Sequence, residues 1–300
     1  MAVTKGSLVT NYGIELDGVF DAFVTEFTIP TLEAEEITAG LSSDWQTKKM
    51  RGGPKYGSFD FSFNLSRASG ALDWARSVWK KSVIEKDLAV VLANSNFEIT
   101  RRVDLIRSLI SAIEFPEFDA KDGKKQLTAK IKGTPEQITF SKGGGKLQGI
   151  TGGKAKTFTT QNFRVDIPGL ASEWFTSFKV PDIEIKLAEE YYGTQRLPSR
   201  LYSAVNVKDA TAKIAQPGQD ALTDLAMKML QDGYVSESEY VTGTLTVLSQ
   251  NMKDELATFT MSAMGLKKME LPKLEGNKET NNYCTATWHC EELEYELLVK

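Results

Sequence analysis

The sequence predicts an α+β fold that is mainly β, made of two tandem β-sandwich or β-barrel domains with one flanking α-helix each. Three observations lead to this fold class. Short segments alternate apolar and polar residues, as strands with one buried face do. Each half of the 300-residue chain holds one amphipathic helical segment. Several segments of the first half also recur, in the same order, in the second half.

The predicted strands are the segments with a period of two. Residues 59–65 and 127–132 alternate in this way in the first half, and residues 241–247 and 284–290 do so in the second. Successive side chains of a strand point to opposite faces. Each of these segments is therefore expected to bury one face against a core.

One helix is predicted in each half. Residues 69–81 and 219–231 place their apolar side chains at helical spacing, and Gly233 follows the second segment as a stop signal. A helix packed on a twisted antiparallel sheet buries one face of each element.

Four segments of the first half find counterparts in the second half. The clearest match pairs residues 27–33 with residues 178–184. The others pair residues 51–56 with 196–202, the helices beginning at Ala71 and Ala221, and residues 127–131 with 284–288. Four matches in one order favour a tandem duplication. They predict a first domain over residues 1–142, a Gly/Lys-rich linker over 143–160 and a second domain over 161–300.

The charge balance is mildly acidic. The chain has 36 Lys and Arg against 40 Asp and Glu, a net charge of −4, whereas a dedicated nucleic-acid binder normally carries a basic excess. No run approaches the roughly 20 apolar residues that a membrane helix needs. The first residues also lack the apolar region of a signal peptide. We therefore expect no membrane anchor and synthesis in a reducing cytoplasm, which suits the two cysteines.

No catalytic, cofactor or metal site emerges from the sequence. On a strand, His289 points to the face opposite Cys284 and Cys290, so the three cannot share a metal ion. The two thiols are predicted to be buried and not disulfide-bonded. The pair Gly153 and Lys154 lacks both the preceding glycine and the following hydroxyl residue of a P-loop. The chain is expected to be no enzyme and to hold no cofactor or metal.

Each half resembles the tube proteins of contractile phage tails and related injection machines, whose relatives include the Hcp protein of type VI secretion. The residues that carry the resemblance are an apolar segment ending in a proline turn (27–33), a loop closing on Gly-Gly-Pro-Lys-Tyr (52–56), the strand 59–65 and the start of the helix at 71–74. The resemblance covers roughly residues 11–140 and 163–298. The second half departs from the pattern, because its long loop lacks the Gly-Gly-Pro motif.

This resemblance implies a structural virion protein of the inner tail tube. Single-domain members form sixfold rings by joining their sheets, and the rings stack into a tube. A chain with two such domains implies a pseudo-sixfold ring of three copies. Also implied are DNA that passes through the lumen without specific binding, and a place in the virion tail after assembly in the host cytoplasm. The implied partners are further copies of the chain and the tail sheath, tape measure and terminator or baseplate proteins.

The polar loop over residues 38–56 is the first candidate contact with an adjacent ring. Its length exceeds that of an ordinary connection. We expect Trp45 to act as an apolar anchor and Lys48, Lys49 and Arg51 to meet acidic partners. The alternative is a long flexible hairpin without a contact. In the second half the corresponding candidates are Tyr191, Tyr192 and Arg196.

Two other functions stay open at the level of the sequence. One is a baseplate or hub protein that initiates the tube of the same machine. The other is a two-domain β-protein that binds a carbohydrate or another ligand, in which the duplication would give two sites.

Overall fold

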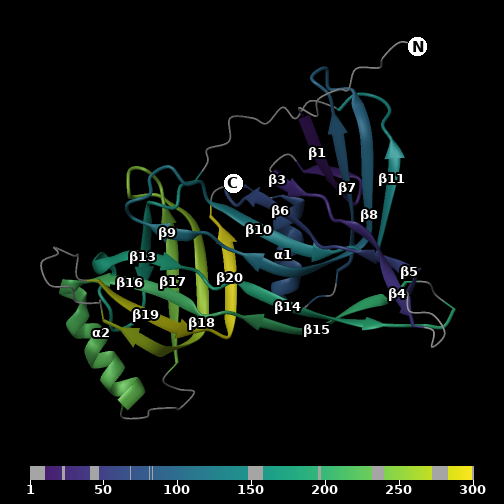
Figure 1. Ribbon diagram of the computed structural model, residues 1–300. Coiled ribbons are helices and arrows are strands. Elements are labelled where there is room, and N and C mark those ends of the chain that lie inside the picture. Colours follow the sequence, from purple (N-terminus) through teal and green to yellow (C-terminus); the bar gives the residue numbers. More distant parts are fainter. Residues whose placement is uncertain are drawn as a thin grey trace, which may run out of the picture.

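The computed structural model of this chain describes residues 11–21, 24–40, 47–67, 69–80, 82, 84–147, 158–194, 197–231, 240–271 and 283–298. Figure 1 shows two β-rich halves side by side, each built on an antiparallel sheet with a helix beside it. The predicted fold class, mainly β with one helix per half, is confirmed.

The first sheet runs in the order β2-β1-β7-β8-β10-β6-β3, and β11 also pairs with β8. Its longest strand, β8, pairs with β7 and β11 through its first part and with β10 through its last part. The sheet therefore changes neighbours along β8 and curls around its core. The strands are β1 (Asn11–Leu16), β2 (Val19–Asp21), β3 (Val24–Thr28), β6 (Phe59–Asn64), β7 (Lys86–Ala93), β8 (Ile99–Glu114), β10 (Thr128–Thr134) and β11 (Gln137–Lys142).

The second sheet repeats the order of the first from β1 to β3, and β2 has no counterpart among its described strands. It runs β12-β17-β18-β19-β16-β13, with β20 paired to β18 as β11 is paired to β8. One strand from the first half, β9 (Glu117–Asp119), is added at its end beside β13. The strands are β12 (Phe163–Asp166), β13 (Phe175–Lys179), β16 (Ala210–Ala215), β17 (Val241–Leu248), β18 (Glu255–Glu270), β19 (Tyr283–His289) and β20 (Glu292–Leu297).

Each half also contains a long two-stranded ribbon. β4 (Leu32–Ala39) pairs with β5 (Lys48–Tyr56), and β14 (Ile183–Glu190) pairs with β15 (Ser199–Val207). Of the residues predicted as a polar loop, 38–56, the structure describes 38–40 and 47–56, and most of these belong to strand β5. This first ribbon carries no apolar alternation because most side chains of β5 are exposed. Pro54 is accepted in β5 because both strands of a two-stranded ribbon are edge strands.

Both predicted helices are confirmed. α1 (Gly70–Trp79) is capped by Ser69, whose side chain accepts a hydrogen bond from the amide of Leu72. Five of its apolar side chains are buried, namely Ala71, Leu72, Trp74, Ala75 and Val78. α2 (Gln219–Ala226) continues as a π-helical turn over Met227–Gln231. Two short 3-10 turns, Ser172–Trp174 and Gln216–Gly218, complete the second half.

Three of the four predicted sequence matches lie in strands, and the ladders place all three on corresponding strands while correcting the register of two. The fourth match joins the two helices, which belong to no ladder. Phe27 and Phe178 hold corresponding places in β3 and β13. In the ribbons, Leu32 pairs with Tyr56 and Ile183 pairs with Val207, so Tyr56 corresponds to Val207 and not to Tyr202. The match of residues 127–131 with 284–288 joins the right strands but is displaced by two positions. The division at 143–160 stays a prediction, because residues 148–157 lie outside the described chain.

Candidate assembly interface

The two halves of the chain meet edge to edge. β9 of the first half pairs with β13 of the second, with Phe118 opposite Phe178. A few residues further on, β14 pairs with the end of β8, where Ile183 lies opposite Ile113. The junction is therefore a continuation of sheet, in which main-chain hydrogen bonds satisfy strand edges that would otherwise be open.

Aromatic side chains fill the junction. Phe118 is completely buried, and its ring lies 5.8 Å from the rings of both Phe163 and Phe259. Phe115 meets Phe259 edge to face at 5.5 Å. Burying a side chain of this size stabilises a contact by roughly 1.5–3 kcal/mol. The apolar core consequently runs without a break through both halves.

Polar groups at the junction are paired across the two halves. The Asp182 carboxylate accepts a hydrogen bond from the Phe115 amide at 2.8 Å and forms an ion pair with Lys179 at 2.7 Å. The Lys179 ammonium also donates to the Phe115 carbonyl. These bonds fix the register of β13 and β14 on the first half, because each uses a specific backbone group.

Two tyrosines bridge the halves at the edges of the junction. The Tyr202 hydroxyl accepts a hydrogen bond from the Ile110 amide at 3.1 Å, and the Tyr295 hydroxyl donates to the Leu65 carbonyl at 2.6 Å. Burial raises the pKa of both phenols above their ordinary value of 10.0.

At the far side of the first half, the same type of edge is open. β3 is the last strand of its sheet and corresponds to β13, yet no described strand lies on its outer side. Phe27 is accordingly half-buried, whereas Phe178 is completely buried. An open edge of this kind is a template for pairing with another chain.

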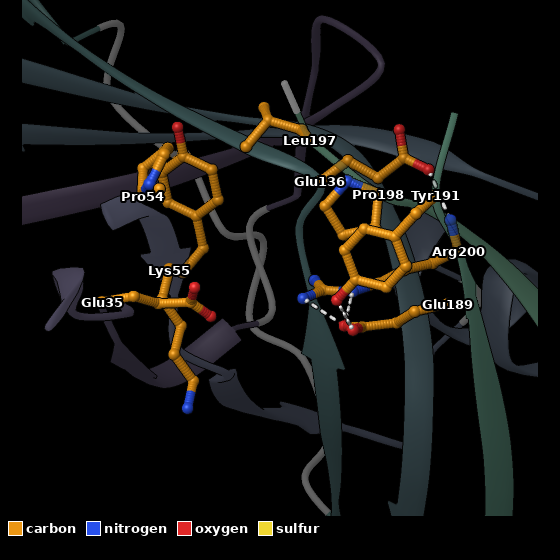
Figure 2. A pocket seen from close by; sticks show the side chains of 11 residues that line it. Glu35, Pro54, Lys55, Glu136, Glu189, Tyr191, Leu197, Pro198 and Arg200 are labelled. Carbon is orange, nitrogen blue, oxygen red and sulfur yellow. Dashed lines mark hydrogen bonds and ion pairs between the residues drawn. The ribbon is translucent and has the colours of Figure 1, made fainter. Parts of the chain in front are cut away.

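The two ribbons lie close together and form a cleft. Figure 2 shows Glu35, Pro54 and Lys55 of the first ribbon facing Tyr191 and Arg200 of the second. Arg200 pairs with Glu189 at 3.0 Å, and its backbone amide donates to Glu136 at 2.9 Å. The Tyr191 hydroxyl bonds Glu189 at 2.9 Å, and this bond is the first cause that lowers the pKa of that carboxyl.

The first ribbon has one acidic and one basic strand. Lys49 pairs across it with Glu36 at 2.8 Å. Apolar side chains are exposed beside these charges, namely Leu32, Ile37 and Met50. The acidic residues of β4 are Glu33, Glu35 and Glu36, and the basic residues of β5 are Lys48, Lys49, Arg51 and Lys55.

The structure places some of the predicted contact residues and leaves others outside the described chain. Lys48, Lys49 and Arg51 are exposed on β5, and Tyr191 and Tyr192 are exposed just after β14. Trp45 and Arg196 lie outside the described residues. The roles predicted for these seven residues in ring contacts stay predictions.

The residues that make the junction were not predicted. A signal for them exists in the sequence, because Phe-Pro-Glu-Phe-Asp at 115–119 recurs as Leu-Pro-Lys-Leu-Glu at 271–275. These segments are short and are not amphipathic over a useful length. Their importance becomes visible only when β9 is seen to join the other sheet.

The predicted buried thiols are confirmed. Cys284 and Cys290 are both free and buried. Within the described part of the chain, no group of His, Cys, Asp and Glu is arranged to hold a metal ion. None of the described helices has the length and apolar character needed to cross a membrane.

Comparison with known proteins gives partial likenesses of fold. No protein-family model and no curated protein matches the sequence. The cap that terminates the tube of the anti-feeding prophage is 16% identical over 47% of this chain and 95% of its own, with a TM-score of 0.42. The sheath/tube terminator of the PVC extracellular contractile injection system is 15% identical over 47% and 99%, with a TM-score of 0.42. A chain of the PVC sheath-tube complex is 17% identical over 46% and 89%, with a TM-score of 0.41.

Proposed function

We propose that this chain is a structural protein that assembles head to tail into rings, which stack into the tube of a tail or contractile injection machine, and that it is not an enzyme. The observation that carries the proposal is the junction between its own halves. It joins sheet edge to sheet edge, and the corresponding edge, β3, lies open at the other side of the first half. A contact between two different surfaces repeats from copy to copy and gives a closed ring or an open filament.

The proposed ring contains three copies. Each copy contributes two halves with the same strand order, so three copies present six similar sheets. This number follows the sixfold rings implied by the sequence resemblance.

The ribbons are the proposed contacts between stacked rings. They carry charges of both signs and exposed apolar side chains, which suits a reversible protein contact. The proposed lumen conducts DNA without binding it specifically, as the net charge of −4 favours. The proposed setting is a virion tail, assembled in the host cytoplasm with sheath, tape measure and terminator or baseplate partners.

Negative-stain electron microscopy of the concentrated protein, with mass measurement in solution, tests the proposal. Hollow tubes or rings with threefold symmetry and six lobes are expected. Single rings that never elongate would favour a tube-initiating baseplate role instead. A protein that stays monomeric at all concentrations and salt conditions would contradict self-assembly and favour the ligand-binding alternative.

A further inference from the structure

We propose that β4 of one copy joins the end of β18 of the next copy, in the register that β14 uses on the end of β8 within the chain. The occupant of the open edge is thus a second copy of this chain. This inference rests on the proposed function and assigns the residues that close the ring.

The ladders define which residues correspond. From β3 and β13 they run across each sheet to β8 and β18, which have sixteen residues each. Arg107 and Ala263 hold the same place in these two strands, and both have positive φ, 49° and 52°. The corresponding rows are Phe27–Phe61–Ile131–Ile113 in the first sheet and Phe178–Ala212–Ala286–Met269 in the second.

Residues buried at the internal junction have exposed counterparts on the first half. Ile183 is 1% exposed, whereas its counterpart Leu32 is 53% exposed. Tyr295 is 4% exposed, whereas its counterpart Phe140, at the same place on β11, is 51% exposed. The first half therefore presents an apolar surface of the kind that its neighbour buries inside the chain.

The complementary surface lies at the end of β18. Phe115 follows β8 and is 4% exposed, whereas Leu271 follows β18 and is 69% exposed. The two unsatisfied surfaces belong to different halves, and Figure 1 shows β4 and β18 on opposite sides of the molecule. Among the described residues, neither surface covers the other within one copy, which leaves both to another copy or to a different protein.

Charge favours the second copy. Within the chain, Glu184 of β14 lies opposite Ala112 of β8. The corresponding residues are Glu33 of β4 and Lys268 of β18, which would face each other as an acid–base pair. Directly opposed charges of unlike sign stabilise an antiparallel pairing, and like charges destabilise it. In the isolated chain Lys268 contacts Glu270 on its own strand, and its side chain stays 58% exposed.

Charge reversal tests the register. Glu33→Lys or Lys268→Glu alone is expected to weaken ring formation by at least about tenfold, because like charges then face each other. The double variant Glu33→Lys/Lys268→Glu restores the pair and is expected to recover assembly. Sedimentation velocity and negative-stain images give the readout, and thermal unfolding verifies that each variant folds. Lys253→Glu, an exposed reversal in a turn away from both surfaces, is the control and should assemble normally.

A cross-link tests the same pairing directly. Leu32 and Met269 correspond to the opposed residues Ile183 and Ile113, so Leu32→Cys/Met269→Cys is expected to form disulfides between copies under mild oxidation. The expected product is a covalent series that ends at the trimer. Leu32→Cys/Met252→Cys, with the second cysteine in a distant exposed turn, should give none.

The outcomes separate the two proposals. The proposed register is wrong if both single reversals assemble normally, or if the double variant fails to recover assembly. In either case, rings formed by the unaltered protein still support the proposed function. Cross-linked products that continue beyond the trimer indicate an open filament and overturn ring closure. If the unaltered chain never self-associates, and the open edge is captured by another protein, both proposals are wrong.

Discussion

Phe118 shows at the scale of one residue how the two halves are joined. It belongs by sequence to the first half, yet its ring is buried between Phe163 and Phe259 of the second. It also sits opposite Phe178 in the added strand. A side chain in this position stabilises both halves at once. Its ring fills part of the core of the second sheet, and its strand β9 is connected along the chain to β8 of the first.

Phe118→Ala is expected to lower the free energy of unfolding by about 3–5 kcal/mol, the usual cost of removing a buried phenylalanine ring. Urea unfolding followed by circular dichroism gives the measurement. Phe97→Ala is the matched control, because Phe97 is 45% exposed, and a change below about 0.5 kcal/mol is expected there. Equal small effects for the two variants would contradict the assigned role of Phe118.

Cys290 provides a pH-dependent contribution to stability. Burial raises the pKa of its thiol to about 11, from an ordinary value of 9.0. The folded protein thus holds the thiol proton more tightly than the unfolded chain does. The resulting stabilisation is fully present below pH 9 and is lost as the pH rises from 9 to about 11.

We expect the difference in unfolding free energy between the unaltered protein and Cys290→Ala to shrink over this alkaline range by about 2 kcal/mol. Urea unfolding at pH 8, 10 and 11 measures this, and other titrating groups cancel because both proteins share them. A difference that stays constant with pH would contradict the raised pKa. The buried thiols should also stay unreactive toward a thiol reagent until the protein unfolds.

At the scale of elements, the ribbons differ from the rest of the fold. Four strands of the sheets, β6, β10, β17 and β19, were predicted from their period of two. β4 and β5 expose most of their side chains, so no burial pattern marks them, and the Gly-Gly-Pro motif was interpreted as a loop. A two-stranded ribbon of this length is stabilised by its own ladder of hydrogen bonds and lies beside the second ribbon, with which it lines a cleft.

Deleting residues 42–50 is expected to leave a folded chain that still forms rings but no long tubes. The deletion removes the end of the first ribbon, including Lys48 and Lys49, while the sheets and their cores keep every strand. Circular dichroism verifies the fold, and tube length is measured in negative-stain images. A triple variant, Lys48→Glu/Lys49→Glu/Arg51→Glu, keeps the ribbon length and should shorten tubes as well. Tubes of normal length in both variants would show that the ribbon makes no contact between rings.

At the scale of the whole molecule, the two halves share one core. A continuous cluster of buried residues runs from the helix α1 and the aromatic strand β6 through the junction to β18 and β20. Bonds such as that from Tyr295 to Leu65 cross the boundary in its interior. Two tandem sheets with this much shared surface have little freedom to move as separate bodies.

Thermal unfolding is therefore expected to occur in a single cooperative transition, in spite of the two sheets. Scanning calorimetry measures this through the agreement of the calorimetric and van't Hoff enthalpies. Phe118→Ala should lower the midpoint of that one transition and not split it. Two resolved transitions in the unaltered protein would indicate that the halves fold independently.

The sequence by itself determined the mainly β class, the two helices and the recurrence of strands. These depend on local patterns, namely a period of two on β6, β10, β17 and β19 and helical spacing on α1 and α2, which tertiary contacts reinforce. It also determined that Cys284 and Cys290 are buried thiols.

Only the tertiary structure decided that β9 leaves its own half, that most of the described residues within 38–56 belong to a ribbon strand, and which residues of the halves correspond. The register of residues 127–131 was displaced because short apolar alternations match themselves at several offsets. That of residues 51–56 was displaced because the ribbon carries no apolar alternation to align, so only the ladder fixes it. The open edge at β3 and the exposed Leu32, Phe140 and Leu271 depend on which surfaces face each other across the chain. No local pattern carries that information, because the contacts that define an edge come from residues far apart in the sequence.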